Sequence, residues 1–512
     1  CRRSTVRVNS FVLSVFLVTG FAIPVAASDA AGSAEQAGDA AVRAPRVFTT
    51  SHSGQFGDRV LEYEAVAGET FLYDQEGKPK ASFFSFSYQE AGVVKPSGRP
   101  VTFLWNGGPG SSSIWLHMGA MGPKRADVPS DAGDVGPPPF TVEDNQLALL
   151  DVTDLVFIDP VGTGFSRAVG SHENKEFWGL ETDTASVAEF IRAWLTRNGR
   201  WMSPKYLIGE SFGTVRAAAV ATHLQEKHYL SVNGIILISQ ALDYTGSTPV
   251  HDNLIAYVSY LPTMAATAWY HGRVSGAPES LEEFLGEVRR FAVEEYAAAL
   301  LAGNLLDPEV RRKVATKLAR YTGLSEEYVE LADLRVLAPR FRKELLRAEG
   351  TSVGRADGRY TGQDVDRTSE RPDGDPSHYK VRSSYAAALN DHLARNLGVA
   401  MDREYKFSGG RELSRNWNWR TVPDDRHWEP SFVNVARDLS RTMRHNAGMR
   451  VMVASGYYDF ATPFFDAELT FARHGFVADR IRFTYYEAGH MMYLHRPSLD
   501  QLMADIRAFM AE

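Results

Sequence analysis

The sequence predicts an α/β protein with a mostly parallel central sheet and an inserted helical cap. Short apolar runs that are typical of buried strands recur at 101–105, 154–159, 205–208, 234–239, 450–455 and 480–486. Segments with helical periodicity at 184–196 and 214–226 separate some of these runs, which indicates βαβ units with helices on both faces of the sheet. Segments with a helical pattern dominate between about 250 and 400, and strand-like runs resume at 450. We therefore expect a block of helices that interrupts one sheet domain.

The first 47 residues are expected to lie outside this domain. Residues 1–27 combine a basic start, an apolar run from Phe11 to Ile23 and small residues up to Ala27, which predicts a secretory signal peptide cleaved after Ala27. The apolar run is shorter than the roughly 18 residues that a membrane span needs, so we expect no stable membrane insertion after signal removal. Residues 28–47 are rich in Ala, Gly and Asp without periodicity, which predicts a flexible leader.

The composition excludes several classes of protein. With 44% hydrophobic and 23% charged residues, the 512-residue chain matches globular proteins and not disordered or multi-span membrane proteins. The one cysteine, Cys1, lies in the expected signal peptide and leaves no disulfide framework, thiolate metal site or cysteine nucleophile. A formal net charge of −8 argues against nucleic acid as a partner. An exported chain without cysteine pairs fits a bacterial protein that is periplasmic or secreted.

The core domain is expected over 48–250 and 401–512. It opens with two segments of alternating apolar and polar residues, 59–74 and 81–89, which flank a turn at Gly77 to Lys80 and predict antiparallel strands. The apolar runs named above follow as the parallel part of the sheet.

The helical cap is expected over 251–400. A helix with one apolar face is predicted from Leu281 through Ala302. Asp307, which precedes Pro308, and Ser325 predict the N-caps of two further helices. Residues 350–376 are too polar and glycine-rich for a core, so we expect a long loop there.

The strongest local motif is GESFG at 209–213, which lies between an apolar strand and an alanine-rich helix. Glycines two positions before and after a serine let the chain turn sharply, so that the hydroxyl projects from the sheet edge at the start of a helix. This pattern predicts a nucleophile elbow with Ser211 as the catalytic nucleophile.

The partners of the serine are expected after later strands, in the order Ser, acid, His. Asp459 follows the run at 450–455, and His490 follows the run at 480–486, each just past the C-terminal end of its strand. We expect Asp459 to orient His490 and His490 to act as the base. Asp466 and His495 are rivals that lie further from the strand ends.

An oxyanion hole is expected where a glycine-rich turn follows an early strand. The run at 101–105 ends in NGGPG, where backbone N–H groups can approach a substrate closely. We assign the N–H groups of Gly108 and Phe212 as the oxyanion donors.

Together these motifs resemble the serine carboxypeptidase family, peptidase family S10. The motifs stand in the order of that family over roughly 100–245 and 450–498: WNGGPGSSS, DLVFIDPVGTGFS, GESFG, GYYDF and EAGHM. The resemblance implies an α/β-hydrolase fold with a cap, no cofactor or metal, and removal of C-terminal amino acids from peptide substrates. It further implies that Asn106, Gly107 and Glu210 bind the substrate, with Asn106 and Glu210 recognising its terminal carboxylate.

One position departs from the family. Well-known members carry a second glutamate that shares a proton with the glutamate before the nucleophile, and matching the loop without gaps places Ala120 there. We therefore expect Glu210 to titrate more ordinarily, unless burial raises its pKa, and carboxylate capture and an acidic optimum to be weakened. His117 or Lys124 could compensate, although a surface or satisfied role is favoured for both.

Two alternatives stay open beside the carboxypeptidase. Ala120 favours an esterase or acyltransferase that uses the same triad and need not recognise a free carboxylate. A catalytically silent binding protein is disfavoured, because Ser211, Asp459 and His490 are all present. Neither a metalloenzyme motif nor a nucleotide-binding motif occurs. Trp417 and Trp419 could line a substrate pocket, but packing of the cap is the favoured role.

Overall fold

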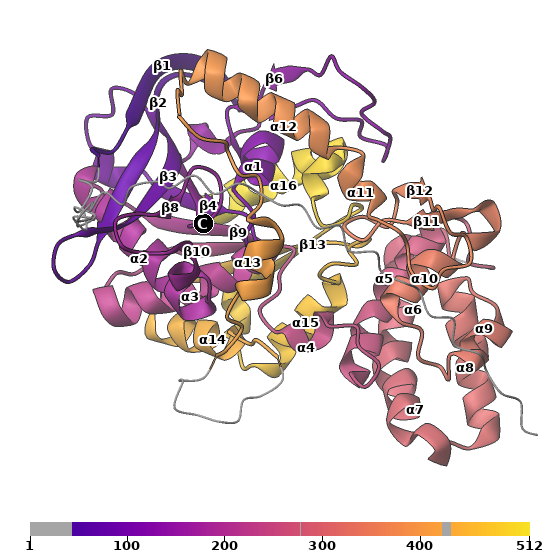
Figure 1. Cartoon of the computed structure of the whole chain (residues 1–512). Helices are drawn as coiled ribbons and strands as arrows, with labels where there is room; N and C mark the ends of the chain where they lie inside the picture. The colour runs from indigo at the N-terminus through magenta and orange to yellow at the C-terminus, as the bar shows by residue number, and fades with distance from the viewer. Residues whose placement is uncertain (1–42, 277, 422–431) are drawn as a thin grey trace, which may run out of the picture. The chain divides into compact units, whose positions relative to one another are not determined.

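A ten-stranded sheet forms the core, in the order β1-β2-β3-β7-β4-β9-β10-β13-β14 with β8 beside β3 (Figure 1). The computed structural model describes residues 43–276, 278–421 and 432–512, so the predicted signal peptide and most of the predicted leader lie outside the described residues. The strands are β1 (Val47–Phe56), β2 (Arg59–Tyr73), β3 (Pro79–Glu90), β4 (Val101–Trp105), β7 (Asp154–Asp159), β8 (Arg167–Ala168), β9 (Lys205–Glu210), β10 (Gly234–Ile238), β13 (Arg450–Gly456) and β14 (Ile481–Tyr486).

The sheet changes direction at β7. Strands β1, β2, β3 and β7 pair antiparallel, whereas β7, β4, β9, β10, β13 and β14 pair parallel. Each strand that the apolar runs predict is present, and the α/β class is confirmed. Strand β1 was not predicted, because all but its last residue are exposed or only partly buried and its sequence carries no apolar alternation.

Helices cover both faces of the sheet, as the continuous apolar runs require. Side chains of β4 alternate between two cores, with Phe103 in one and Leu104 in the other. The helices on the Phe103 face include α2 (Leu180–Arg197), α3 (Phe212–His228) and α14 (Ala436–His445), and those on the Leu104 face include α12 (Arg382–Asp391) and α16 (Arg496–Ala511).

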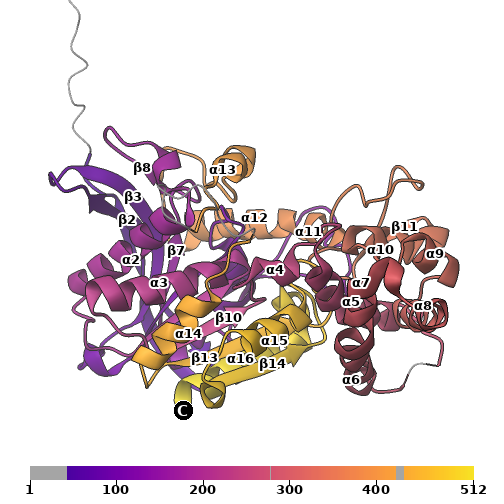
Figure 2. The same cartoon turned by 90° about the horizontal axis from the view of Figure 1, so that it is seen from below.

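A helical block follows β10 and precedes β13 (Figure 2). Its elements are α4 (Tyr244–Ser247), α5 (Leu254–Tyr270), α6 (Leu281–Phe291), a π-helical turn (Ala292–Tyr296), α7 (Ala297–Ala302), α8 (Pro308–Thr322), α9 (Glu326–Leu331), α10 (Ala338–Glu344) and α11 (Pro376–Tyr379). The predicted N-caps are confirmed, since the side chains of Asp307 and Ser325 accept hydrogen bonds from the first turns of α8 and α9. Phe460 and Phe464, which follow β13, pack into the core of this block and so tie it to the C-terminal end of that strand.

The predicted loop at 350–376 contains a short hairpin and buries several of its residues. It contains the hairpin β11 (Thr351–Val353) and β12 (Thr361–Gln363), and Val353, Asp357 and Tyr360 are buried. The expectation that this polar segment lies outside the core was wrong, because its polar groups find partners: Asp357 pairs with Arg359 and accepts from the backbone N–H of Gly489.

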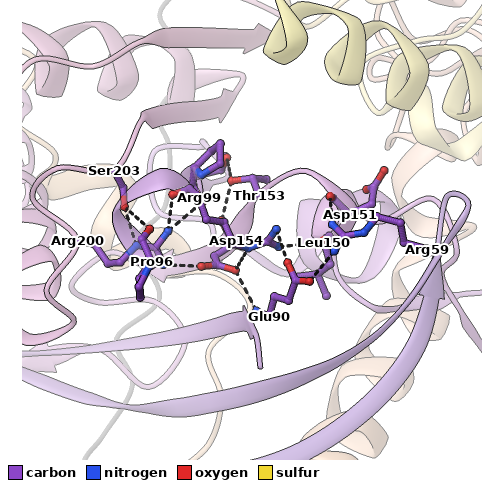
Figure 3. Close-up of polar contacts among 12 residues, drawn as sticks. Arg59, Glu90, Pro96, Arg99, Leu150, Asp151, Thr153, Asp154, Arg200 and Ser203 are labelled. Atoms are coloured by element: carbon purple, nitrogen blue, oxygen red, sulfur yellow. Dashed lines mark hydrogen bonds and ion pairs between the residues drawn. The ribbon is translucent and has the colours of Figure 1, made fainter. Parts of the chain in front are cut away.

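An ionic network joins the N-terminal ends of β4, β7 and β9 to the C-terminal end of the antiparallel β3 (Figure 3). Asp154 opens β7 and accepts hydrogen bonds from Arg99, before β4, and from Arg200, before β9, at 2.7 and 2.5 Å. Arg99 also pairs with Glu90 of β3, which in turn pairs with Arg59. The network therefore ties five neighbouring strands, β2, β3, β7, β4 and β9, at the edge opposite the glycine-rich loop and the serine. No helix within the described residues is long and apolar enough to cross a membrane.

Candidate active site

A cavity of about 410 Å³ opens at the C-terminal ends of the parallel strands. It brings together loops that follow β4, β9, β13 and β14 with parts of the helical block. The residues that line it are Asn106, Gly107, Gly108, Ser111, Trp115, Glu210, Ser211, Ala241, Tyr244, Ser247, Arg355, Ala356, Asp375, His378, Trp419, Ala461, Thr462, His490 and Met491. Most of the predicted site residues therefore share one cavity.

Ser211 sits on a sharp turn between β9 and α3. Its backbone has φ 60° and ψ −129°, a strained conformation for a residue other than glycine, and it precedes the first residue of α3. A Cβ atom on Gly209 would lie only 2.0 Å from the carbonyl oxygen of Gly213. The turn therefore needs glycine at position 209, as the predicted nucleophile elbow requires.

Asp459 and His490 form a buried pair. The Nδ1 atom of His490 lies 2.7 Å from Oδ2 of Asp459. Asp459 also accepts hydrogen bonds from the backbone N–H groups of Ala461 and Thr462 and from the Thr462 hydroxyl. Three hydrogen bonds thus hold the carboxylate toward the imidazole.

The charge of His490 depends on this pair. Burial lowers the pKa of His490, but the charge and the hydrogen bond of Asp459 outweigh burial, so the net pKa is raised above its usual value. Asp459 therefore favours the imidazolium that a general base becomes when it accepts a proton.

The backbone of His490 is held from two sides. Its N–H donates to the carbonyl oxygen of Ala356 in the helical block, and its carbonyl oxygen accepts from the hydroxyl of Ser239 after β10. Ser211 and His490 line the same cavity, yet no hydrogen bond joins them among the described contacts. Such bonds are often long in free enzymes and tighten when substrate binds.

The glycine-rich loop packs directly on the elbow. A Cβ atom on Gly107 would lie 2.5 Å from the backbone nitrogen of Phe212, so only glycine allows this approach. Gly108 has φ 110°, in the region that favours glycine. The two predicted oxyanion donors are Gly108, which follows β4, and Phe212, which begins α3. The close packing of the loop on the elbow brings these two parts of the chain together.

Asn106 is fixed in orientation by two contacts. Its Oδ1 atom accepts from the backbone N–H of Leu116, and its carbonyl oxygen accepts from Arg216 of α3 at 2.8 Å. Arg216 is itself paired with Asp183 of α2. The Nδ2 atom of Asn106 is buried and has no hydrogen-bond partner among the described residues, so it is an available donor beside the cavity.

Glu210 does not titrate ordinarily. Burial raises its pKa from 4.5 to about 7, although the nearby charge of His490 and the hydroxyl of Tyr493 act in the opposite direction. The carboxyl therefore keeps its proton up to nearly neutral pH and can donate a hydrogen bond. From the sequence we expected Glu210 to titrate ordinarily unless burial raised its pKa, and burial does raise it.

The rival and compensating residues lie elsewhere. Asp466 is buried in the first turn of α15 (Phe464–Arg473) beside Gly246 and not beside His490, and His495 contacts Ser498 at the start of α16. His117 is fully buried and contacts the hydroxyl of Tyr88 at 2.7 Å. Lys124 pairs with Asp144. None of these four lines the cavity, so the satisfied roles favoured for His117 and Lys124 fit the structure.

The two tryptophans do not pack the cap as favoured. Trp417 is buried in the core on the α3 side of the sheet, where its ring centroid lies 5.2 Å from that of Phe212. Trp419 is 41% exposed, contacts Phe212 and Tyr244, and lines the cavity. The pocket role that the sequence left open thus fits Trp419.

Several residues of the site carried no sequence signal. Arg355 and Asp375 reach the cavity from a segment expected to be a loop, and Tyr493 contacts Glu210 from beyond His490. Arg216 gave a weak signal, since it is the one charged residue in the alanine-rich first half of its helix. Among the described residues, no group of three or more His, Cys, Asp or Glu side chains could hold a metal ion.

Comparisons with known proteins point to one family. A family model described as serine carboxypeptidase matches residues 67–498. "Serine carboxypeptidase-like 36" from Arabidopsis thaliana is 26% identical over 180 residues, which is 33% of this chain and 34% of that protein. "Serine carboxypeptidase-like 45" from the same plant is 22% identical over 271 residues, which is 52% of each chain. The match thus spans from about a third to about half the length of these curated relatives.

A solved structure shows the same fold. It is Kex1(delta)p, described as a prohormone-processing carboxypeptidase from Saccharomyces cerevisiae, with a TM-score of 0.51 and 16% sequence identity. The likeness covers 88% of this chain and 91% of that one. The fold is the α/β-hydrolase fold that the sequence motifs imply.

Proposed function

Because the chain belongs to the serine carboxypeptidase family, we propose that it hydrolyses C-terminal peptide bonds through an acyl-enzyme on Ser211. The observation that carries the proposal is the presence of two buried donors, the Glu210 carboxyl and the Asn106 amide, in the cavity that Ser211 and His490 line. Donors placed there can bind a terminal carboxylate and so set which peptide bond reaches the serine.

In the first step His490 takes the proton of Ser211 as the hydroxyl attacks the carbonyl carbon of the last peptide bond. Asp459 holds the imidazole and stabilises its charge. The N–H groups of Phe212 and Gly108 donate to the developing oxyanion. His490 then gives the proton to the leaving amine, and the C-terminal amino acid departs.

In the second step water replaces the amine. His490 removes a proton from water as the water oxygen attacks the acyl carbon. The bond between this carbon and Oγ of Ser211 then breaks, His490 returns the proton to Oγ, and the shortened peptide leaves with a new carboxylate. Every proton moves through side chains of this chain, so the proposed reaction needs no cofactor.

The test is the identity of the products. Mass spectrometry of a peptide incubated with the protein is expected to show residues lost one at a time from the C-terminus, and Ser211→Ala is expected to abolish the ladder. Internal cleavage, or loss from the N-terminus, would contradict the proposal.

The second candidate is an esterase or acyltransferase on the same triad. Ala120 favours it, because this fully buried methyl group stands where the family's second carboxyl would be. The test compares the hydrolysis rates of acyl esters with and without a free carboxylate on the leaving group. If the carboxylate does not increase the rate, this candidate is favoured over the carboxypeptidase.

Export to a bacterial periplasm or medium is a further part of the proposal. It rests on the sequence of residues 1–27, which lie outside the described residues. N-terminal sequencing of the protein recovered from expressing cells is expected to begin at Ser28, whereas retention of residues 1–27 in the cytoplasm would contradict it.

A further inference from the structure

Tyr493 reaches the candidate site from behind the cavity. It lies three residues after His490, in a short 3-10 turn (Met492–Leu494), and is 1% exposed. Its hydroxyl donates to Oε2 of Glu210 at 2.7 Å. Glu210 lines the cavity and Tyr493 does not, so the phenol contacts the side of the carboxyl away from a bound substrate.

The neighbouring wall is shaped to admit the tyrosine ring. A Cβ atom on Gly119 would lie 2.6 Å from the ring of Tyr493 and 2.6 Å from the hydroxyl of Tyr385. The next residue is Ala120, whose small side chain is fully buried. Two small residues in sequence thus leave the space in which Tyr493 packs.

Two neutral groups, the hydroxyl of Tyr493 and the side-chain amide of Asn106, act on Glu210, and of these Tyr493 makes the hydrogen bond at 2.7 Å. The titratable groups around it are His490, Asp459, Tyr385 and Tyr493, and Arg355 adds a charge near His490. No ion pair joins Glu210 to an arginine or lysine within the described residues. The orientation of the carboxyl therefore depends on neutral groups, with the Tyr493 hydroxyl as the bonded donor, and not on a cation.

We propose that Tyr493 is a positioning residue that holds Oε2 of Glu210, so that the other oxygen carries its proton toward the cavity. A protonated Glu210 then accepts from Tyr493 through one oxygen and donates to the substrate's terminal carboxylate through the other. The Nδ2 atom of Asn106 supplies the second donor. The inference rests on the proposed function and deepens it, because it assigns how the protein binds the terminal carboxylate of the substrate.

Tyr493→Phe tests the proposal, since it removes the hydroxyl and keeps the ring. For a peptide with a free C-terminus we expect KM to rise about tenfold with kcat nearly unchanged, the effect of losing one positioning hydrogen bond. An acyl ester without a carboxylate is expected to keep its KM. Because the phenol stabilises ionised Glu210, its loss is also expected to move the alkaline fall in activity on the free-acid peptide to higher pH.

Tyr385→Phe is the matched control. Tyr385 is another buried tyrosine near Glu210, and no hydrogen bond between the two is present among the described contacts. The Tyr385→Phe variant is expected to leave the KM for both substrates unchanged. Equal effects of the two variants, or a Tyr493→Phe effect of the same size on the ester, would overturn the proposal.

A spectroscopic titration separates this proposal from the proposed function. The carboxylic-acid band of Glu210, assigned by infrared difference against Glu210→Gln, is expected to titrate at higher pH in Tyr493→Phe than in the wild type. An unchanged midpoint overturns the positioning role whatever the substrate is. If the midpoint shifts but the protein shows no preference for free-acid peptides, carboxylate recognition and the proposed function are both overturned. The hydrogen bond between Tyr493 and Glu210 would still stand.

Discussion

At the scale of single residues, burial decides what Glu210 can do. A solvated glutamate is ionised at neutral pH and repels a substrate carboxylate, whereas a buried one keeps its proton and becomes a donor. The position of Glu210, directly before Ser211, was evident from the motif. Its protonation was not, because the burial that raises its pKa arises only when distant parts of the chain pack around it.

Glu210→Gln is expected to stabilise the protein at alkaline pH. The pKa of Glu210 rises from 4.5 in the unfolded chain to about 7 in the fold, so its contribution to stability is fully present below about pH 4.5 and is lost as the pH rises through 7. Such a shift corresponds to at most about 3 kcal/mol. Urea denaturation at pH 5 and pH 8 checks this, with the exposed Glu412→Gln as the control. A gain in unfolding free energy that is equal at both pH values would contradict it.

Asp459→Asn is expected to disable the base without unfolding the protein. The amide can still accept from Thr462 and Ala461, but it no longer favours the imidazolium of His490. We expect kcat to fall by about 10⁴-fold on peptides and esters alike. Steady-state kinetics beside circular dichroism checks this, and a loss below about tenfold would remove Asp459 from the predicted triad.

At the scale of elements, patterns that are local in sequence were predicted well. The parallel strands are continuous apolar runs and were found, and the N-caps at Asp307 and Ser325 depend only on neighbouring residues. The segment 350–376 was misjudged because its order comes from distant partners, such as the contact between Asp357 and Gly489. Local composition carries no information about such contacts.

The ionic network at the opposite edge of the sheet is expected to be structural. Asp154→Ala leaves the buried Arg200 and the partly buried Arg99 without their shared carboxylate, which we expect to cost about 3–5 kcal/mol of unfolding free energy. Because the network is remote from the cavity, KM and kcat of the folded fraction should not change. Denaturant unfolding and kinetics below the transition check both statements. A large change in KM with an unchanged free energy of unfolding would contradict the structural role of the network.

At the scale of the whole molecule, the helical block does more than cover the cavity. It supplies the carbonyl oxygen of Ala356 to the N–H of His490, and Asp357 binds the N–H of Gly489. His490 is therefore held between the sheet and the inserted block. Both contacts must persist for His490 to keep its place.

Asp357→Ala is expected to lower kcat about tenfold for peptides and esters alike, because the loop that carries His490 loses one anchor. Asp364→Ala is the matched control: Asp364 pairs with buried Lys343 in the same block and contacts no residue of the site. The control should lose stability and keep kcat in its folded fraction. Equal kcat losses in the two variants would show that the block acts on the site only through its general stability.

The most direct test of the central claim compares an N-blocked dipeptide with its C-terminal amide across about pH 4 to 9. Both substrates need neutral His490, so both rates should rise with pH on the acidic side. Only the free acid needs protonated Glu210, so its kcat/KM should exceed that of the amide below about pH 7 and fall above it. In Glu210→Gln, whose amide remains a donor, the alkaline fall should disappear. Equal rates for acid and amide at every pH would contradict carboxylate recognition by Glu210.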